Sequence, residues 1–166
     1  MPDIGSYVIY GANGICTVKD KRKEKLCGTK NEYYVLSPLG SNNSTIYVPA
    51  DNSELVARMK SILSRSEIIS LIADMGDDEI FWQSDNKLRN EEFGRIIDKG
   101  DRKELLKLIK CIYLKKKELN ANNKKLWAAD EATLKRAEAM INAEFSLVLE
   151  IKPEEVPSFI ENIIGK

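Results

Sequence analysis

The sequence contains no histidine among its 166 residues. Histidine is the commonest general base and the commonest zinc ligand, so its absence excludes every catalytic triad built on imidazole and most zinc sites. The cysteines are three, Cys16, Cys27 and Cys111. Their odd number and the lack of a Cys-x-x-Cys pair argue against a disulfide framework and against a cysteine-based metal site. We therefore expect no metal and no cofactor.

Long hydrophobic runs are also missing. No apolar stretch approaches the roughly 20 residues that a membrane-spanning helix needs. The first four residues lack the basic and apolar regions of a secretory signal. We expect a cytoplasmic protein without a membrane partner, and a hydrophobic content of 43% is sufficient for a buried core.

Catalytic motifs are scarce. Ser84 and Lys87 form one Ser-x-x-Lys pair, but none of the supporting motifs of that hydrolase class accompanies it. The acidic residues at 77–79 lack the ordered spacing of a calcium loop, and no glycine-rich segment is followed by the Lys-Ser or Lys-Thr of a phosphate loop. The sequence thus predicts no catalytic residue, no small-molecule substrate and no enzyme.

The net charge is zero, with 26 basic and 26 acidic residues, but the charges are unevenly distributed. Residues 101–125 contain nine lysines or arginines and only three acids. Lys103, Lys107 and Lys110 lie at the i, i+4, i+7 spacing that places them on one face of a helix. Such a face is either solvated or a site for phosphates, and three or four phosphate contacts alone give only weak, salt-sensitive binding.

The first fifty residues have a β pattern. Short runs at 7–10, 15–18, 33–36 and 45–48 are rich in aromatic and β-branched residues, and glycine- and asparagine-rich turns separate them. Strands this short and closely spaced predict a small SH3/Tudor-like β-barrel. The charged residues 19–25 extend a hairpin into solvent, either as a plain ribbon tip or as an edge that docks a partner strand.

The remaining residues have a helical period. Ser64 and Glu67 form a capping box, the segment 86–99 is amphipathic and ends at Gly100, and Asp101 caps the next helix. A long helix over 129–150 and a short one over 157–165 complete the pattern. The predicted fold is therefore α+β, with a barrel domain at 1–55 followed by a compact bundle of about five helices at 56–166.

Two tryptophans lie in the helical part. Trp82 stands in a polar stretch near Lys87 and Arg89, so it is either a packing residue or an exposed wedge that enters a DNA minor groove while its basic neighbours hold phosphates. Trp127 follows Leu126 just before the long helix. This position predicts a hydrophobic staple against the first turns of that helix.

Several motifs, taken in order, resemble one family over essentially the whole chain. They are Gly5-x-Tyr7-Val8-Ile9-Tyr10, Gly14-Ile15, Tyr33-Tyr34-Val35-Leu36, Tyr47-Val48-Pro49-Ala50-Asp51-Asn52, Trp82, Gly100-Asp101 and Leu134-Lys135-Arg136-Ala137-Glu138. This set is similar to the CarD (CdnL) family of bacterial RNA polymerase-binding regulators. The first module also resembles the polymerase-interacting module of the transcription-repair coupling factor, but the helical half and the lack of helicase motifs favour CarD.

The resemblance implies two partners. The barrel would dock on the β subunit of RNA polymerase, with Lys23, Lys25, Tyr47 and Pro49 as contact candidates; Tyr47 replaces an arginine that some members carry. The helical domain would contact the upstream edge of the melted promoter without reading its sequence and hinder bubble collapse. Trp82 matches the family's wedge into the minor groove, and the candidates for phosphate contacts are Lys87, Arg89, Lys103, Lys107 and Lys110.

Two further hypotheses remain open at this point. In one, the protein is an interaction module in which the barrel binds a partner strand and the helical bundle is only a scaffold. In the other, it is an enzyme, which a pocket with convergent carboxylates would support.

Overall fold

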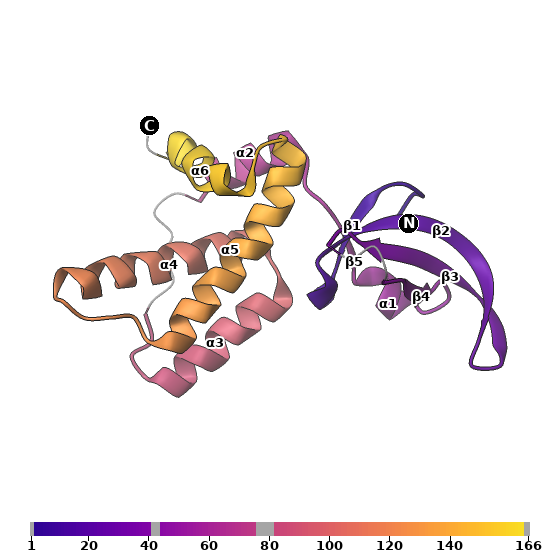
Figure 1. Cartoon of the computed structure of the whole chain (residues 1–166), viewed down its shortest axis with the longest axis horizontal. Helices are drawn as coiled ribbons and strands as arrows, with labels where there is room; N and C mark the ends of the chain where they lie inside the picture. Colours follow the sequence, from indigo (N-terminus) through magenta and orange to yellow (C-terminus); the bar gives the residue numbers. More distant parts are fainter. Residues whose placement is uncertain (1, 41–43, 76–81, 165–166) are drawn as a thin grey trace. The chain divides into compact units, whose positions relative to one another are not determined.

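The computed structural model describes residues 2–40, 44–75 and 82–164. The chain divides into two compact units, Met1–Ile62 and Leu63–Lys166 (Figure 1). Within these described residues, the first unit contains five strands and one short α-helix, and the second contains five α-helices. The predicted α+β class, with strands first and about five helices after them, is confirmed. Neither unit has, among its described residues, a helix long and apolar enough to cross a membrane.

The first unit is a five-stranded antiparallel sheet with the strand order β4-β3-β2-β1-β5. Strand β5 was not predicted from the sequence. A short helix, α1 (Ser53–Ala57), connects β4 to β5 and packs next to both of these edge strands. The strands are β1 (Tyr7–Tyr10), β2 (Ile15–Leu26), β3 (Thr29–Pro38), β4 (Ile46–Pro49) and β5 (Met59–Ser61).

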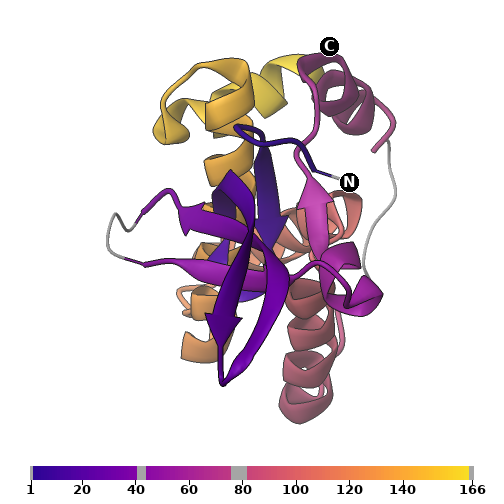
Figure 2. The same ribbon diagram turned by 90° about the vertical axis from the view of Figure 1, so that its right-hand side faces the viewer.

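Strands β2 and β3 form a ribbon that extends well beyond the other strands (Figures 1 and 2). The predicted extension of the hairpin by the charged residues 19–25 is confirmed, because they continue β2 up to Leu26. A register shift between Val18 and Asp20 separates the part of β2 over the core from the exposed ribbon. Ion pairs such as Lys21–Glu32, at 3.6 Å, link the two strands there.

The sheet buries one small core. Alternation along β3 and β4 directs Tyr34, Leu36 and Val48 to the same side, where each is at most 1% exposed. Leu55 and Val56 of α1 pack against this core. The buried residues of this core are Val8, Cys16, Val18, Tyr34, Leu36, Val48 and Met59.

The helices of the second unit begin and end close to the predicted residues. The side chains of Ser64, Asp85 and Asp101 each accept a hydrogen bond from a backbone N–H at the start of a helix. Gly100, in the left-handed region with φ 69°, ends α3 as predicted. The helices are α2 (Arg65–Ala73), α3 (Asn86–Lys99), α4 (Arg102–Ala121), α5 (Ala128–Leu149) and α6 (Val156–Ile164).

Helices α3, α4 and α5 pack against one another and enclose the larger core (Figure 1). Leu105, Leu108 and Ile112 of α4 are fully or almost fully buried, and they share one core with Phe93 of α3 and Phe145 of α5. Helices α2 and α6 pack together and against α5. The bundle thus holds the start of α3, the end of α4 and the start of α5 in fixed positions.

A buried carboxylate, Glu144, fixes the point where the chain enters the helical unit. Its side chain is 2% exposed and accepts two hydrogen bonds from the guanidinium of Arg102, both at 2.9 Å. It also accepts the backbone N–H of Leu63 at 2.9 Å. These bonds compensate for the removal of the carboxylate from water.

The turn at the ribbon tip provides a test of the sheet. Cys27 and Gly28 connect β2 to β3 with φ values of 53° and 82°, the pattern of a type I′ hairpin turn. Asparagine tolerates the left-handed region better than cysteine does. We expect Cys27→Asn to raise the free energy of unfolding by about 0.5 to 1 kcal/mol, measured by urea denaturation. Gly28→Ala is the control and should have the opposite effect; equal destabilisation by both would contradict the turn assignment.

Candidate functional site

The four predicted polymerase contacts lie on two different faces of the sheet. In the β3–β4 register Tyr47 pairs with Val35 and Pro49 pairs with Tyr33, so Tyr47 and Pro49 share one face. The β2–β3 register places Lys23 and Lys25 on the other face, the one that carries Tyr34. Both lysines are exposed on the ribbon, beyond the end of β4. A flat partner surface cannot contact all four residues at once.

We call the first of these faces the Tyr47 face. Tyr33 and Tyr47 meet edge to face on it, with ring centroids 6.1 Å apart. Val35 lies on β3 directly opposite Tyr47. It is 5% exposed although it points away from the main core of the sheet. Arg22 is the basic residue of β2 on this face, and its hydrogen bonds to Glu24 and Tyr47 raise the pKa of its guanidinium. The face thus combines an aromatic patch with a permanent positive charge.

Sequence reasoning missed Arg22 and Tyr33. The register shift between Val18 and Asp20 changes which residues of β2 share a face, and nothing in the sequence marked it. A strand register with the shift included would have placed Arg22 beside Tyr33.

In the helical unit, Trp82 is half-buried and not a freely projecting wedge. Its ring packs edge to face against Phe93, at 5.9 Å between centroids, and Phe93 is completely buried. Trp82 also packs against the main core of the unit. The packing reading therefore holds for part of this side chain, while the rest remains at the surface.

Arg89 corrects a second prediction. Its side chain is 3% exposed, and its guanidinium forms a bidentate ion pair with Asp130, at 3.0 Å and 2.6 Å. Two further hydrogen bonds go to the carbonyl of Gln83 and the side chain of Asn86. A guanidinium committed to these partners is not placed to contact a phosphate, so the predicted phosphate role of Arg89 does not fit the structure.

The guanidinium instead organises two aromatic rings. Its central carbon lies 4.4 Å from the ring centroid of Trp82 and 5.7 Å from that of Trp127. We call Trp82, Arg89, Trp127 and Asp130 the tryptophan cluster. Two parts of the chain that are distant in sequence meet there: Trp82 together with Arg89 of α3, and Trp127 together with Asp130 at the start of α5.

Trp127 is the exposed member of the tryptophan cluster. It is 46% exposed, whereas its neighbour Leu126 packs against the core. Leu126, and not Trp127, is therefore the residue of this pair that packs against the core, so the packing role predicted for Trp127 does not fit the structure. The signal was present in the sequence, because Lys124 and Lys125 precede Trp127 just as Lys87 accompanies Trp82.

The predicted basic residues are divided between two places. Lys87 is exposed on the first turn of α3, next to the tryptophan cluster. Lys103, Lys107 and Lys110 lie on the first half of α4, are half-buried and already interact within the chain; the Lys107 amine lies 3.7 Å from Glu104. Another lysine of α4, Lys115, is closer to the cluster, with its amine 5.6 Å from the ring centroid of Trp82.

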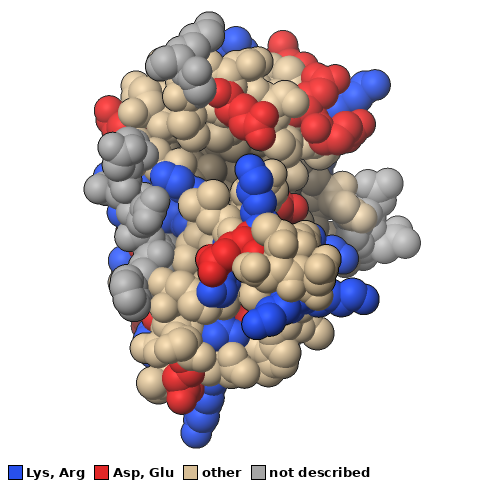
Figure 3. Space-filling view, turned by 90° about the vertical axis from the view of Figure 1, so that its left-hand side faces the viewer, with Lys and Arg blue, Asp and Glu red and all other residues tan. Residues whose placement is uncertain are grey.

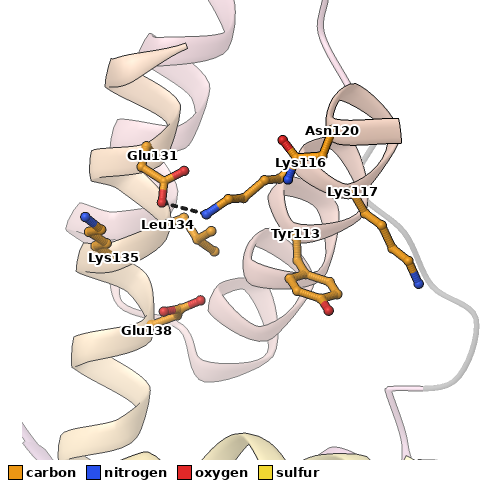
Figure 4. A pocket seen from close by; sticks show the side chains of 8 residues that line it. All are labelled: Tyr113, Lys116, Lys117, Asn120, Glu131, Leu134, Lys135 and Glu138. Carbon is orange, nitrogen blue, oxygen red and sulfur yellow. Dashed lines mark hydrogen bonds and ion pairs between the residues drawn. The ribbon is translucent and has the colours of Figure 1, made fainter. Parts of the chain in front are cut away.

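The surface of the helical unit carries basic side chains and an open groove. On the face shown in Figure 3, basic side chains are spread over the middle and lower part, and most acidic ones are at the top. An open groove of ≈ 480 Å³ lies between the end of α4 and the start of α5. Lys116 crosses it to Glu131 at 2.9 Å (Figure 4). Its other lining residues are Tyr113, Lys117, Asn120, Leu134, Lys135 and Glu138.

The carboxylates of the groove do not converge on one another (Figure 4). The two, Glu131 and Glu138, stand among three lysines, and Glu131 is already paired. Over the residues that the structure describes, no group of three potential metal ligands is found.

Comparison with known proteins agrees with the architecture of the first unit. A small antiparallel sheet with an aromatic, partly charged outer face is typical of a protein-docking domain. Residues 3–60 match the family described as CarD-like/TRCF RID domain. No curated protein matches the chain.

Residues 3–60, nearly the whole of the first unit, are thus similar to a family of RNA polymerase-interacting domains. The match supports a transcription-related role that involves binding to RNA polymerase. The match ends before the helical unit begins at Leu63.

The ion pair at the centre of the tryptophan cluster can be tested directly. Arg89→Met leaves the carboxylate of Asp130 buried without its partner, so we expect a loss of about 3 to 5 kcal/mol in the free energy of unfolding, measured by urea denaturation. Arg58→Met removes an exposed pair with Glu54 and should cost less than about 1 kcal/mol. Arg89→Met combined with Asp130→Leu should recover part of the loss. If Arg89→Met and Arg58→Met lowered the free energy of unfolding equally, the structural role of Arg89 would be contradicted.

Proposed function

We propose that the protein is a transcription regulator that binds the β subunit of RNA polymerase through its sheet and contacts the upstream edge of the promoter bubble through its helical unit, stabilising the open complex. The single observation that supports it most is the match of residues 3–60 to a polymerase-interacting domain family. The DNA contact is supported by the tryptophan cluster and its lysines.

On the polymerase side, the Tyr47 face is the preferred contact surface. The face includes β4, which is an edge strand. In the described part of the sheet, β4 pairs with β3 on one side and with no strand on the other. An edge strand offers backbone N–H and C=O groups to a partner strand, and aromatic residues beside it add contact area. Tyr47 and Pro49 remain the contact candidates on this face, with Arg22 added. Lys23 and Lys25 lie on the opposite face and are left outside this contact surface.

On the DNA side, aromatic rings and lysines act together. An aromatic side chain at the end of a duplex stacks on a base that has lost its neighbour, and this interaction is worth about 1 to 3 kcal/mol per base without depending on sequence. Lysine amines hold the phosphates on either side. Because such a contact exists only while the strands are apart, it lengthens the lifetime of the melted state.

The two contacts depend on each other. Lys87, Lys115, Lys124 and Lys125 offer a handful of phosphate contacts, each of which adds about 0.9 to the salt slope of binding. Affinity of this kind is weak at physiological salt. Attachment to the polymerase raises the effective concentration of the helical unit near the promoter. In this proposal the sheet supplies the affinity, and the helical unit stabilises the open complex.

The polymerase contact is tested by comparing one variant on each face of the sheet. We expect Tyr47→Ala to weaken binding of the full chain to RNA polymerase about tenfold, because it removes a central aromatic contact, measured by surface plasmon resonance. Lys23→Glu, on the opposite face, is the matched control and should change the affinity by less than about threefold. A stronger effect of Lys23→Glu would move the docking surface to that face.

The DNA contact is tested by the lifetime of open complexes on a weak promoter. We expect Trp82→Ala to leave polymerase binding intact and to shorten the lifetime by about tenfold, because it removes one ring of the tryptophan cluster proposed to contact melted DNA, measured by competitor challenge. Thr133→Ala, which removes only an intrahelical hydrogen bond to the carbonyl of Ala129, is the control. An unchanged lifetime in a Trp82→Ala protein that binds polymerase would leave the alternative, in which the helical unit is only a scaffold.

A further inference from the structure

We propose that Trp127 is the side chain that stacks on an unpaired base of DNA, and that Trp82 and Arg89 support it from behind. The inference rests on the proposed contact between the helical unit and melted DNA, and it identifies the residue that makes this contact. It assigns to Trp127 a role that its position in the sequence did not suggest.

The two tryptophans differ in how much of the ring is available. Trp82 is held by Phe93 on the core side, by the Arg89 guanidinium at 4.4 Å and by the amine of Lys115 at 5.6 Å. Trp127 is 46% exposed, and the ring contact that the structure gives it is with the same guanidinium at 5.7 Å. Trp127 therefore has free ring surface where Trp82 has little.

The support behind Trp127 is rigid. Arg89 cannot move away from the rings without breaking its bidentate ion pair with Asp130. Asp130 is in turn tied to Trp127, because its backbone N–H donates to the carbonyl of Trp127 at 3.0 Å. A ring held in this way loses little conformational freedom when a base stacks on it, which favours binding.

The charges around the exposed ring of Trp127 favour a negatively charged partner. Lys124 and Lys125 are exposed immediately before Trp127, and Lys87 is exposed on α3. The nearby acids are largely neutralised: Asp130 by Arg89, Glu131 by Lys116 and Glu118 by Lys115. A flat aromatic surface that directly follows two exposed lysines matches a base and its flanking phosphates. We therefore assign the occupant as a single-stranded nucleotide segment.

The chain contains two tryptophans, so fluorescence can distinguish them. The full-length variants Trp82→Phe and Trp127→Phe each keep one indole and an aromatic ring at the replaced position. Both are titrated with an oligothymidylate of about ten nucleotides at low salt. We expect saturable quenching in Trp82→Phe, where Trp127 remains, and little quenching in Trp127→Phe.

Affinity provides a second measurement. We expect Trp127→Ala to weaken binding of the oligonucleotide at least about fivefold, the lower range for one lost base-stacking contact, in fluorescence anisotropy with a labelled strand. Tyr113→Ala is the matched control, because Tyr113 is another exposed aromatic residue of the helical unit, 54% exposed on α4. It should change the affinity by less than about twofold. The urea midpoint of each variant shows whether it is folded.

Three outcomes would overturn the assignment: quenching confined to Trp82, no binding of the oligonucleotide by the unaltered chain, or equal Trp127-dependent binding of an acidic peptide. The last would indicate a protein partner. Because no polymerase is present, these outcomes are separate from a failure of the proposed function. That failure would appear as open-complex lifetimes unchanged by Trp82→Ala and Trp127→Ala despite base stacking at Trp127.

Discussion

The helical unit depends on one buried ion pair, Arg89–Asp130, with its charged atoms as close as 2.6 Å and both side chains at most 3% exposed. Burying two charges is expensive, and the cost is offset only when nearly every donor and acceptor is satisfied. Here the remaining donors of Arg89 reach Gln83 and Asn86, so the pair connects three segments. The positions of both tryptophans follow from it, since each ring lies against the same guanidinium.

In the sheet, side chains cover an apolar outer face. A small sheet cannot bury both of its faces, and the outer face of β3 and β4 is nevertheless largely apolar, with Val35 and Tyr33 almost completely buried. Tyr47 and the charged side chains of β2 shield this face from water. The same side chains therefore determine how much of this apolar face is open to water.

Much of the fold could be predicted from the sequence, and particular residues show why. Caps and stops are local signals, so Ser64, Asp101 and Gly100 indicated helix boundaries to within a residue. The extent of β2 and the existence of β5 depended on pairing between distant residues and could not be read locally. In the candidate site, the region of Trp82 was found from an aromatic residue near basic ones. The roles of Arg89 and Trp127 were missed because Asp130, which determines both, lies 41 residues from Arg89 in sequence.

The anchoring of Leu63 by Glu144 has a consequence for the helical unit itself. Glu144 lies on α5, while its partners are Leu63, which precedes α2, and Arg102, which begins α4. One carboxylate therefore joins three segments that are distant in sequence. The start of α2 and the start of α4 cannot shift away from α5 without leaving a buried charge without its partners.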